Sequence, residues 1–143
     1  MFENKIYTGI REGLHALGTA GWRLSVVTSK PLTFAIPILA HFALDSLFAS
    51  VYGSELSGER SDKAELIAHA LRAERASADQ VIMIGDRAHD IHGARANGVQ
   101  SLGVLWGYGT REELVQAGAD GICETVDALV ADLARRMLRG VAG

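Results

Sequence analysis

The chain contains the segment Val81-Ile82-Met83-Ile84-Gly85-Asp86-Arg87-Ala88-His89-Asp90, in which an apolar strand pattern runs into two acidic residues. The residues Val81–Ile84 predict a buried strand that ends at Gly85. In an open α/β sheet, the ligand site lies beyond the carboxyl ends of the strands. Carboxylates at that edge, such as those of Asp86 and Asp90, are the ligands that a hard cation like Mg²⁺ prefers. The segment therefore predicts an α/β sheet with a cation site at one edge.

Strand and helix patterns alternate before and after this segment. Strands are expected at Leu24–Val27, Phe48–Tyr52, Val81–Ile84, Leu102–Trp106 and Gly121–Glu124. Helices are expected to begin near Ile10, Pro31, Lys63, Ala88, Thr110 and Thr125. Thr110 and Glu113 have the spacing of a capping box. The alternation predicts a three-layer α/β fold, with a mostly parallel, Rossmann-like sheet and helices on both faces, in a single domain over residues 1–143.

The composition narrows the class of protein. A length of 143 residues, 48% hydrophobic and 22% charged, is enough to bury a core and is typical of a globular domain. The net charge of −3 provides no basic surface for nucleic acid or an anionic membrane. The single Cys123 excludes an internal disulfide, and the apolar stretch Leu32–Leu44 is too short to span a bilayer. We expect a cytoplasmic protein that binds neither nucleic acid nor membrane.

Polar residues stand where several of the expected strands end. Thr28 and Ser29 follow the first strand, Lys63 opens the helix after the second, and Asp86 follows the third. Each has an ordinary structural explanation, since a threonine can cap a turn and a lysine in a first helical turn is usually solvated. In a parallel sheet, however, these ends converge on one edge. A hydroxyl, an ammonium group and a cation-binding carboxylate together would recognise a phosphate beside a metal ion.

The same residues lie in motifs that resemble those of a known family. The motifs are Val26-Val27-Thr28-Ser29-Lys30-Pro31, Ser61-Asp62-Lys63-Ala64-Glu65-Leu66, Gly85-Asp86-Arg87-Ala88-His89-Asp90 with Gly93–Gly98 behind it, and Gly103–Gly109. Together they resemble the haloacid dehalogenase (HAD) superfamily, and in particular its phosphoglycolate phosphatase-like branch. The resemblance runs from about Tyr7 to Leu129 and implies a hydrolase of phosphate monoesters.

The resemblance also implies a role for each site residue. Thr28, with Ser29 beside it, would bind the phosphoryl group of a small phosphorylated metabolite. Lys63 would bind the same group and offset the charge of the attacking carboxylate. Asp86 would ligate Mg²⁺, and Asp90 would be either a second ligand or a partner that orients the first. Arg87 and His89 are expected at the surface or behind the ligands rather than in the chemistry.

One part of the family pattern is missing from these 143 residues. The family's first strand ends in an Asp-x-Asp motif that supplies the nucleophile and the general acid/base. No Asp precedes Asp45, and Glu3 and Glu12 do not end an apolar strand. The small helical cap between the first and second motifs is absent as well. The resemblance therefore implies a HAD core without its first strand and cap, which we expect to be inactive by itself.

The missing strand would lie in the middle of the family's sheet, between the strands that end at Thr28 and Asp86. Its absence would leave two facing strand edges with unpaired backbone groups. The two strands could pair directly, the gap could take a strand from a second copy, or the chain could be a piece of a longer protein. We favour association, because strand swapping is a low-cost route to a homo-oligomer.

Two hypotheses about function follow. The first is a Mg²⁺-dependent phosphatase-family domain whose complete form hydrolyses phosphate monoesters. The second is a non-catalytic module that retains a phosphate and Mg²⁺ pocket, or only the fold, and works through association. The identity of the substrate is left open between phosphoglycolate, a nucleoside monophosphate and phosphotyrosine.

Overall fold

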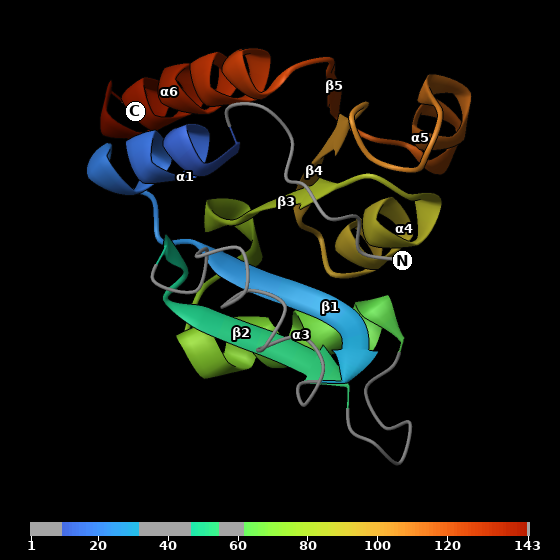
Figure 1. Ribbon diagram of the computed structural model, residues 1–143. Coiled ribbons are helices and arrows are strands. Elements are labelled where there is room, and N and C mark those ends of the chain that lie inside the picture. The colour runs from blue at the N-terminus through green and yellow to red at the C-terminus, as the bar shows by residue number, and fades with distance from the viewer. Residues whose placement is uncertain (1–9, 32–46, 55–61, 143) are drawn as a thin grey trace.

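The computed structural model describes residues 10–31, 47–54 and 62–142 (Figure 1). Their helices and strands are α1 Ile10–Thr19, β1 Ser25–Pro31, β2 Ser50–Ser54, α3 Lys63–Glu74, β3 Ile82–Gly85, α4 Ala88–Ala96, β4 Gln100–Val104, α5 Arg111–Ala117, β5 Gly121–Cys123 and α6 Val126–Ala142. A short 3-10 turn, Ala78–Gln80, precedes β3. The alternation of strands and helices confirms the predicted α/β class. Within the described residues, no helix combines the length and apolar character needed to cross a bilayer.

One predicted element boundary is wrong. Pro31 was expected in the first turn of a helix, but it is the last residue of β1 and is the partner of Ser54 in β2. A proline is tolerated at this position because the end of an edge strand does not need its N–H for pairing. The helix expected after Pro31, with Pro37 inside it, lies outside the described residues.

All strand pairs are parallel, but they form two separate sheets. The order is β1–β2 in one sheet and β3–β4–β5 in the other. The larger sheet keeps an uninterrupted register from Ile82 opposite Gln100 to Gly85 opposite Gly103, whereas the β1–β2 register shifts between Val27 and Pro31. The direct pairing of β1 with β3, which would have closed the gap, is not formed in the described part of the chain.

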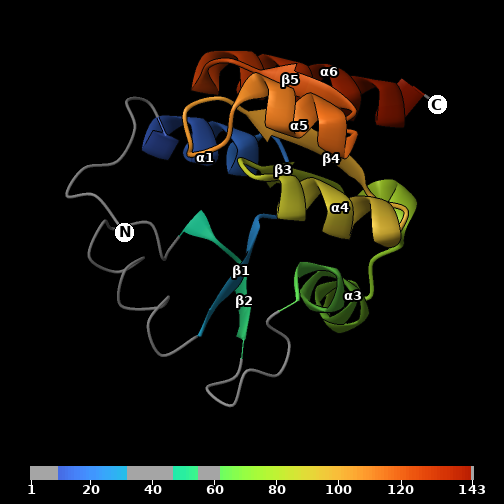
Figure 2. The same cartoon turned by 90° about the vertical axis from the view of Figure 1, so that its right-hand side faces the viewer.

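Helices cover both faces of the strands, as predicted. Figures 1 and 2 show α1 beside α6 on one face and α3 beside α4 on the other. Because side chains alternate along a strand, β3 contributes to both cores. Ile82 and Ile84 join the core under α1 and α6, while Met83 joins the one under α3 and α4.

Both cores extend across the gap between the two sheets. Leu24, just before β1, packs in the same cluster as Ile84 of β3, and Val27 of β1 packs in the same cluster as Met83. The two sheets are therefore held by shared apolar contacts and not by strand pairing.

Candidate active site

The acidic residues of the Gly85–Asp90 segment have different surroundings. Asp90 lies in the first turn of α4 and is 5% exposed. Its Oδ2 accepts hydrogen bonds from the backbone N–H of Asp86, at 3.2 Å, and of Arg87, at 3.3 Å. A side chain at Gly85 would overlap the Asp90 carboxylate, so the glycine is needed for this approach. Asp90 thus fixes the turn that presents Asp86.

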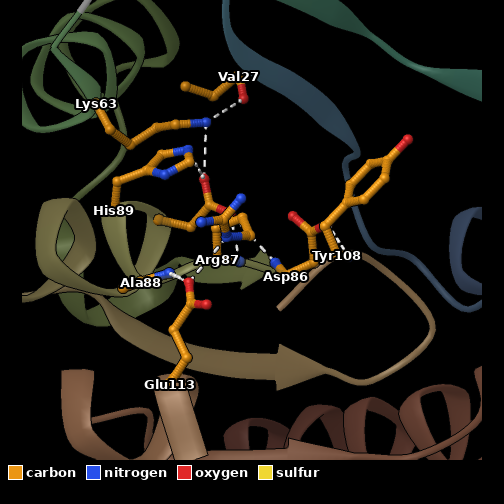
Figure 3. A network of polar contacts seen from close by, with 9 residues as sticks. Val27, Lys63, Asp86, Arg87, Ala88, His89, Tyr108 and Glu113 are labelled. Atoms are coloured by element: carbon orange, nitrogen blue, oxygen red, sulfur yellow. Dashed lines mark hydrogen bonds and ion pairs between the residues drawn. The ribbon is translucent and has the colours of Figure 1, made fainter. Parts of the chain in front are cut away.

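Lys63, the first residue of α3, is buried against Asp90, and its side chain points toward the Val27 carbonyl group (Figure 3). Its Nζ lies 2.9 Å from Asp90 Oδ1 and donates to the carbonyl oxygen of Val27 at 3.0 Å. The two side chains are only 8% and 7% exposed, which contradicts the solvated-lysine interpretation. A lysine in a first helical turn opposes the helix dipole, so the adjacent carboxylate supplies the charge that stabilises it. His89 Nε2 lies 3.6 Å from the same Asp90 oxygen.

The position of Lys63 depends on a close contact between two helices. A Cβ on Gly93 of α4 would press on the Lys63 side chain and on the backbone of Ala64. Asn97, at the end of α4, donates from Nδ2 to the carbonyl oxygens of Ala64 and Gly93, both at 2.9 Å. Gly93 and Asn97 therefore hold the first turn of α3 against α4.

A cleft of about 400 Å³ brings the predicted residues together. Its lining contains Thr28 from β1, Lys63 from α3 and Asp86 after β3, together with neighbouring residues of β1 and β3. His89 and Trp106 line it as well. The cleft therefore brings together four of the five candidates, Thr28, Lys63, Asp86 and Asp90. The side chain of Ser29, the remaining candidate, lies outside the described residues.

The loop after β4 holds Asp86 from the other side. The backbone N–H of Tyr108 donates to Asp86 Oδ2 at 2.9 Å. Side chains at Gly107 or Gly109 would collide with Asp86, so the two glycines let this loop pass over it. Tyr108 lies in the Gly103–Gly109 motif, from which this contact was not predicted. The pair of glycines flanking Tyr108 was the available signal, since such glycines often mark a close backbone approach.

Glu113 of α5 contacts the same turn in a way that the capping box did not predict. The expected cap at Thr110 is formed, because Glu113 N–H donates to Thr110 Oγ1 at 3.1 Å. The Glu113 carboxylate, however, reaches α4 and accepts from Ala88 N–H at 2.7 Å and from Arg87 Nε at 2.9 Å. The Arg87 guanidinium, and then the Ala88 N–H, lower the pKa of Glu113.

The residues present are compatible with a Mg²⁺ site of limited protein ligation. One Asp86 oxygen is held by Tyr108 N–H, and the other accepts no hydrogen bond from the described residues. Both oxygens of Asp90 have partners, which supports its role in orienting Asp86 rather than as a ligand. In the described ranges, no three or more His, Cys, Asp or Glu residues are placed so that together they could hold a metal ion. This fits Mg²⁺, which often binds one or two carboxylates, several waters and a substrate phosphate.

Comparison with known proteins identifies the class. The family model for haloacid dehalogenase-like hydrolases matches residues 2–104. Because this is more than half of the chain, and because the fold and the cleft are those that the motifs predicted, the chain belongs to that family.

Individual relatives agree with this assignment. The chain is 46% identical over 129 residues to a 5′-nucleotidase of Pseudomonas aeruginosa, covering 90% of this chain and 58% of the relative. It is 32% identical over 133 residues to a phosphoglycolate phosphatase of Colwellia psychrerythraea, covering 93% and 59%. A solved structure, described as a predicted phosphatase from Clostridium acetobutylicum, matches with a TM-score of 0.89 and 41% identity over 92% of this chain and 61% of that one. The chain spans about three fifths of the length of these proteins.

Proposed function

We propose that this chain forms the phosphate- and Mg²⁺-binding part of a phosphate monoester hydrolase. The observation that carries the proposal is the cleft in which Thr28, Lys63 and Asp86 meet. It combines a hydroxyl donor, an ammonium group and a carboxylate, which is the set that binds a phosphate and its counter-cation. The relatives are named for different phosphate monoesters, so the proposed substrate is a small phosphorylated metabolite and not a particular compound.

Each residue has a separate task in this proposal. The ammonium group of Lys63, fixed between Val27 and Asp90, binds phosphoryl oxygens and offsets their charge. The Thr28 hydroxyl donates to another phosphoryl oxygen, and Asp86 holds the metal. Mg²⁺, when bound, neutralises charge on the phosphoryl group during its transfer. Asp90 keeps both Lys63 and Asp86 in place.

The nucleophile has to come from a carboxylate that the described cleft does not contain. Asp86 and Asp90 are the only carboxylates that line it among the described residues, and both have the tasks just given. We therefore expect these 143 residues alone to hydrolyse phosphate esters negligibly, since loss of a nucleophile costs about 10⁴-fold or more. Among the described residues, β1 and β3 do not pair with each other, and this supports an extended segment between them as the source of the carboxylate.

The proposal is tested with the purified chain, its mass verified. We expect binding of inorganic phosphate in the presence of Mg²⁺, measured by calorimetry, and no turnover of p-nitrophenyl phosphate. Thr28→Val should weaken phosphate binding several-fold. Adding a segment with an apolar strand and an Asp-x-Asp ending, either fused or as a peptide, should restore hydrolysis. Absence of phosphate binding contradicts the proposed site, and robust turnover by the chain alone contradicts the need for an added carboxylate.

A second candidate is a non-catalytic module that works by association. The two separate parallel sheets favour it, because their facing edges could take a strand from a second copy. Sedimentation analysis of the purified chain separates the cases. A homo-oligomer without turnover supports the module, and a compact, stable monomer argues against strand exchange.

A further inference from the structure

An arginine stands directly beside the proposed cation ligand. Arg87 follows Asp86 in sequence, and its N–H donates to the Asp90 carboxylate. Its side chain is 48% exposed, and its guanidinium is bound by Glu113, which reaches from α5 (Figure 3). The side chain of Arg87 is therefore directed to α5 by one identifiable contact.

The contact between Arg87 and Glu113 affects the charge beside the Asp86 carboxylate. Glu113 raises the pKa of Arg87 most, and the carboxylates of Asp86 and Asp90 make smaller contributions in the same direction. A guanidinium pairs readily with a carboxylate through its fork of N–H donors. An Arg87 released from Glu113 would have Asp86 as an adjacent anionic partner, and a cation would then have to compete for that oxygen.

We propose that Glu113 is a positioning residue that holds Arg87 away from Asp86 and so keeps the Asp86 carboxylate available to a divalent cation. The inference rests on the cation site of the proposed function and adds a residue that acts on it from outside the cleft. Glu113 is well placed for this task, since its backbone N–H is fixed by Thr110 and its carboxylate by Ala88 N–H. The carboxylate that binds Arg87 is therefore also bound by the first turn of α4.

The experiment compares four forms of the chain: wild type, Glu113→Gln, Arg87→Ala and the double variant. Mn²⁺ replaces Mg²⁺ as the probe, because it prefers the same oxygen ligands, and the electron paramagnetic resonance signal of free Mn²⁺ reports binding. Glutamine keeps an oxygen for Ala88 N–H and removes only the charge. We expect Glu113→Gln to weaken Mn²⁺ binding about tenfold, a coupling of the size that adjacent charges produce. Arg87→Ala alone should leave the affinity within about twofold, and the double variant should return to that level.

Recovery of the Mn²⁺ affinity in the double variant distinguishes electrostatic positioning by Glu113 from a purely structural role. If Glu113 only stabilised the start of α4, removing Arg87 as well would not restore the affinity. The matched control is Glu124→Gln, which removes another Arg–Glu pair near α5, with Arg111 at 2.5 Å, and should not change Mn²⁺ binding. If Glu113→Gln does not fold, Glu113→Asp replaces it, since its shorter side chain cannot reach both partners and the same weakening and recovery are expected.

The outcomes separate the two proposals. If wild type does not bind Mn²⁺, or if Asp86→Asn binds it equally well, the cation site itself is wrong and the inference is overturned with it. If Asp86→Asn abolishes binding but Glu113→Gln binds as tightly as wild type, only the role of Glu113 is overturned. Failure of the double variant to recover has the same consequence. Weakening by Glu113→Gln together with recovery in the double variant supports the inference.

Discussion

The two sheets differ in the contacts that fix the residues each contributes to the cleft. In the β3–β4–β5 sheet the strands keep one register, and the turn after β3 is fixed by Asp90, by Tyr108 N–H and by Glu113. In the β1–β2 sheet the register shifts after Val27, close to Thr28. The cation side of the cleft is thus assembled by local contacts. The phosphate side depends on contacts that cross from one sheet to the other.

Lys63 is central to this difference because it contacts both sides. Its Nζ donates a hydrogen bond to the Val27 carbonyl oxygen of the β1–β2 sheet. The same Nζ forms an ion pair with the Asp90 carboxylate beside the β3–β4–β5 sheet. The Lys63 side chain therefore contacts the backbone of one sheet and a carboxylate beside the other. A buried ion pair and shared apolar cores thus join the two sheets, which no strand pairing connects in the described residues.

The largest expected effect comes from removing this bridge. Lys63→Met leaves the Asp90 carboxylate buried without its cation and should lower the free energy of unfolding by about 3–5 kcal/mol. Urea denaturation followed by circular dichroism measures the change.

The control for this prediction neutralises the partner as well. Adding Asp90→Asn to Lys63→Met removes the buried charge but keeps an oxygen for the N–H groups of Asp86 and Arg87. We expect about half of the lost stability to return. A loss below about 1 kcal/mol in Lys63→Met would show that the pair does not hold the two sheets together.

A smaller effect is expected from disturbing the packing of Gly85 against Asp90, on the cation side of the cleft. Gly85→Ala places a methyl group against the Asp90 side chain and should destabilise the fold by about 1–3 kcal/mol. Gly18→Ala is the matched control, because it lies in α1 with no atom within 4 Å of the new methyl group. There we expect unchanged or increased stability, by up to about 1 kcal/mol. Thermal unfolding compares the two variants, and equal melting temperatures would contradict the packing described at Gly85.

The smallest effect concerns the contact of the β1–β2 sheet with α3. Glu74 of α3 accepts hydrogen bonds from Tyr52 Oη of β2 and from Arg23 Nε, and these lower its pKa from 4.5 to about 2. Because the folded-state pKa is depressed, the stabilisation is present above pH 4.5 and is lost as the pH falls toward about 2. Tyr52→Phe removes the largest cause of this shift and should cost about 1 kcal/mol at neutral pH.

The pH dependence provides the check on that prediction. The free energy of unfolding should fall less steeply between pH 4.5 and about 2 in Tyr52→Phe than in wild type, since Glu74 then titrates nearer its ordinary pKa. Parallel curves for the two proteins would mean that Tyr52 does not stabilise the Glu74 carboxylate.

Much of the fold could be predicted from the sequence. The strand before Gly85, the helix from Ala88 and the cap at Thr110 follow from apolar periodicity and local capping, which act over a few residues. The end of β1 could not be predicted in this way. Pro31 suits a first helical turn as well as a strand end, and its pairing with Ser54 decides between them.

The candidate site likewise contains some residues that the sequence predicted and others that it did not. Thr28, Lys63 and Asp86 could be selected because parallel strands bring their ends to one edge. The contributions of Tyr108 and Glu113 could not, since one acts through its backbone N–H and the other through a carboxylate already explained as a cap. The glycines on either side of Tyr108 are the only sequence signal for its contact, and the contact of Glu113 with Arg87 has none.

By itself, the sequence determined the α/β class, the family motifs and the side chains that face the cleft, because these depend on short-range periodicity and on residue chemistry. Only the tertiary structure decided that Lys63 is buried against Asp90 and that β1 and β3 do not pair with each other in the described part of the chain. The same holds for the binding of Arg87 by Glu113. The physical reason is that burial and charge pairing depend on which distant segments come into contact, and that is a property of the packed chain.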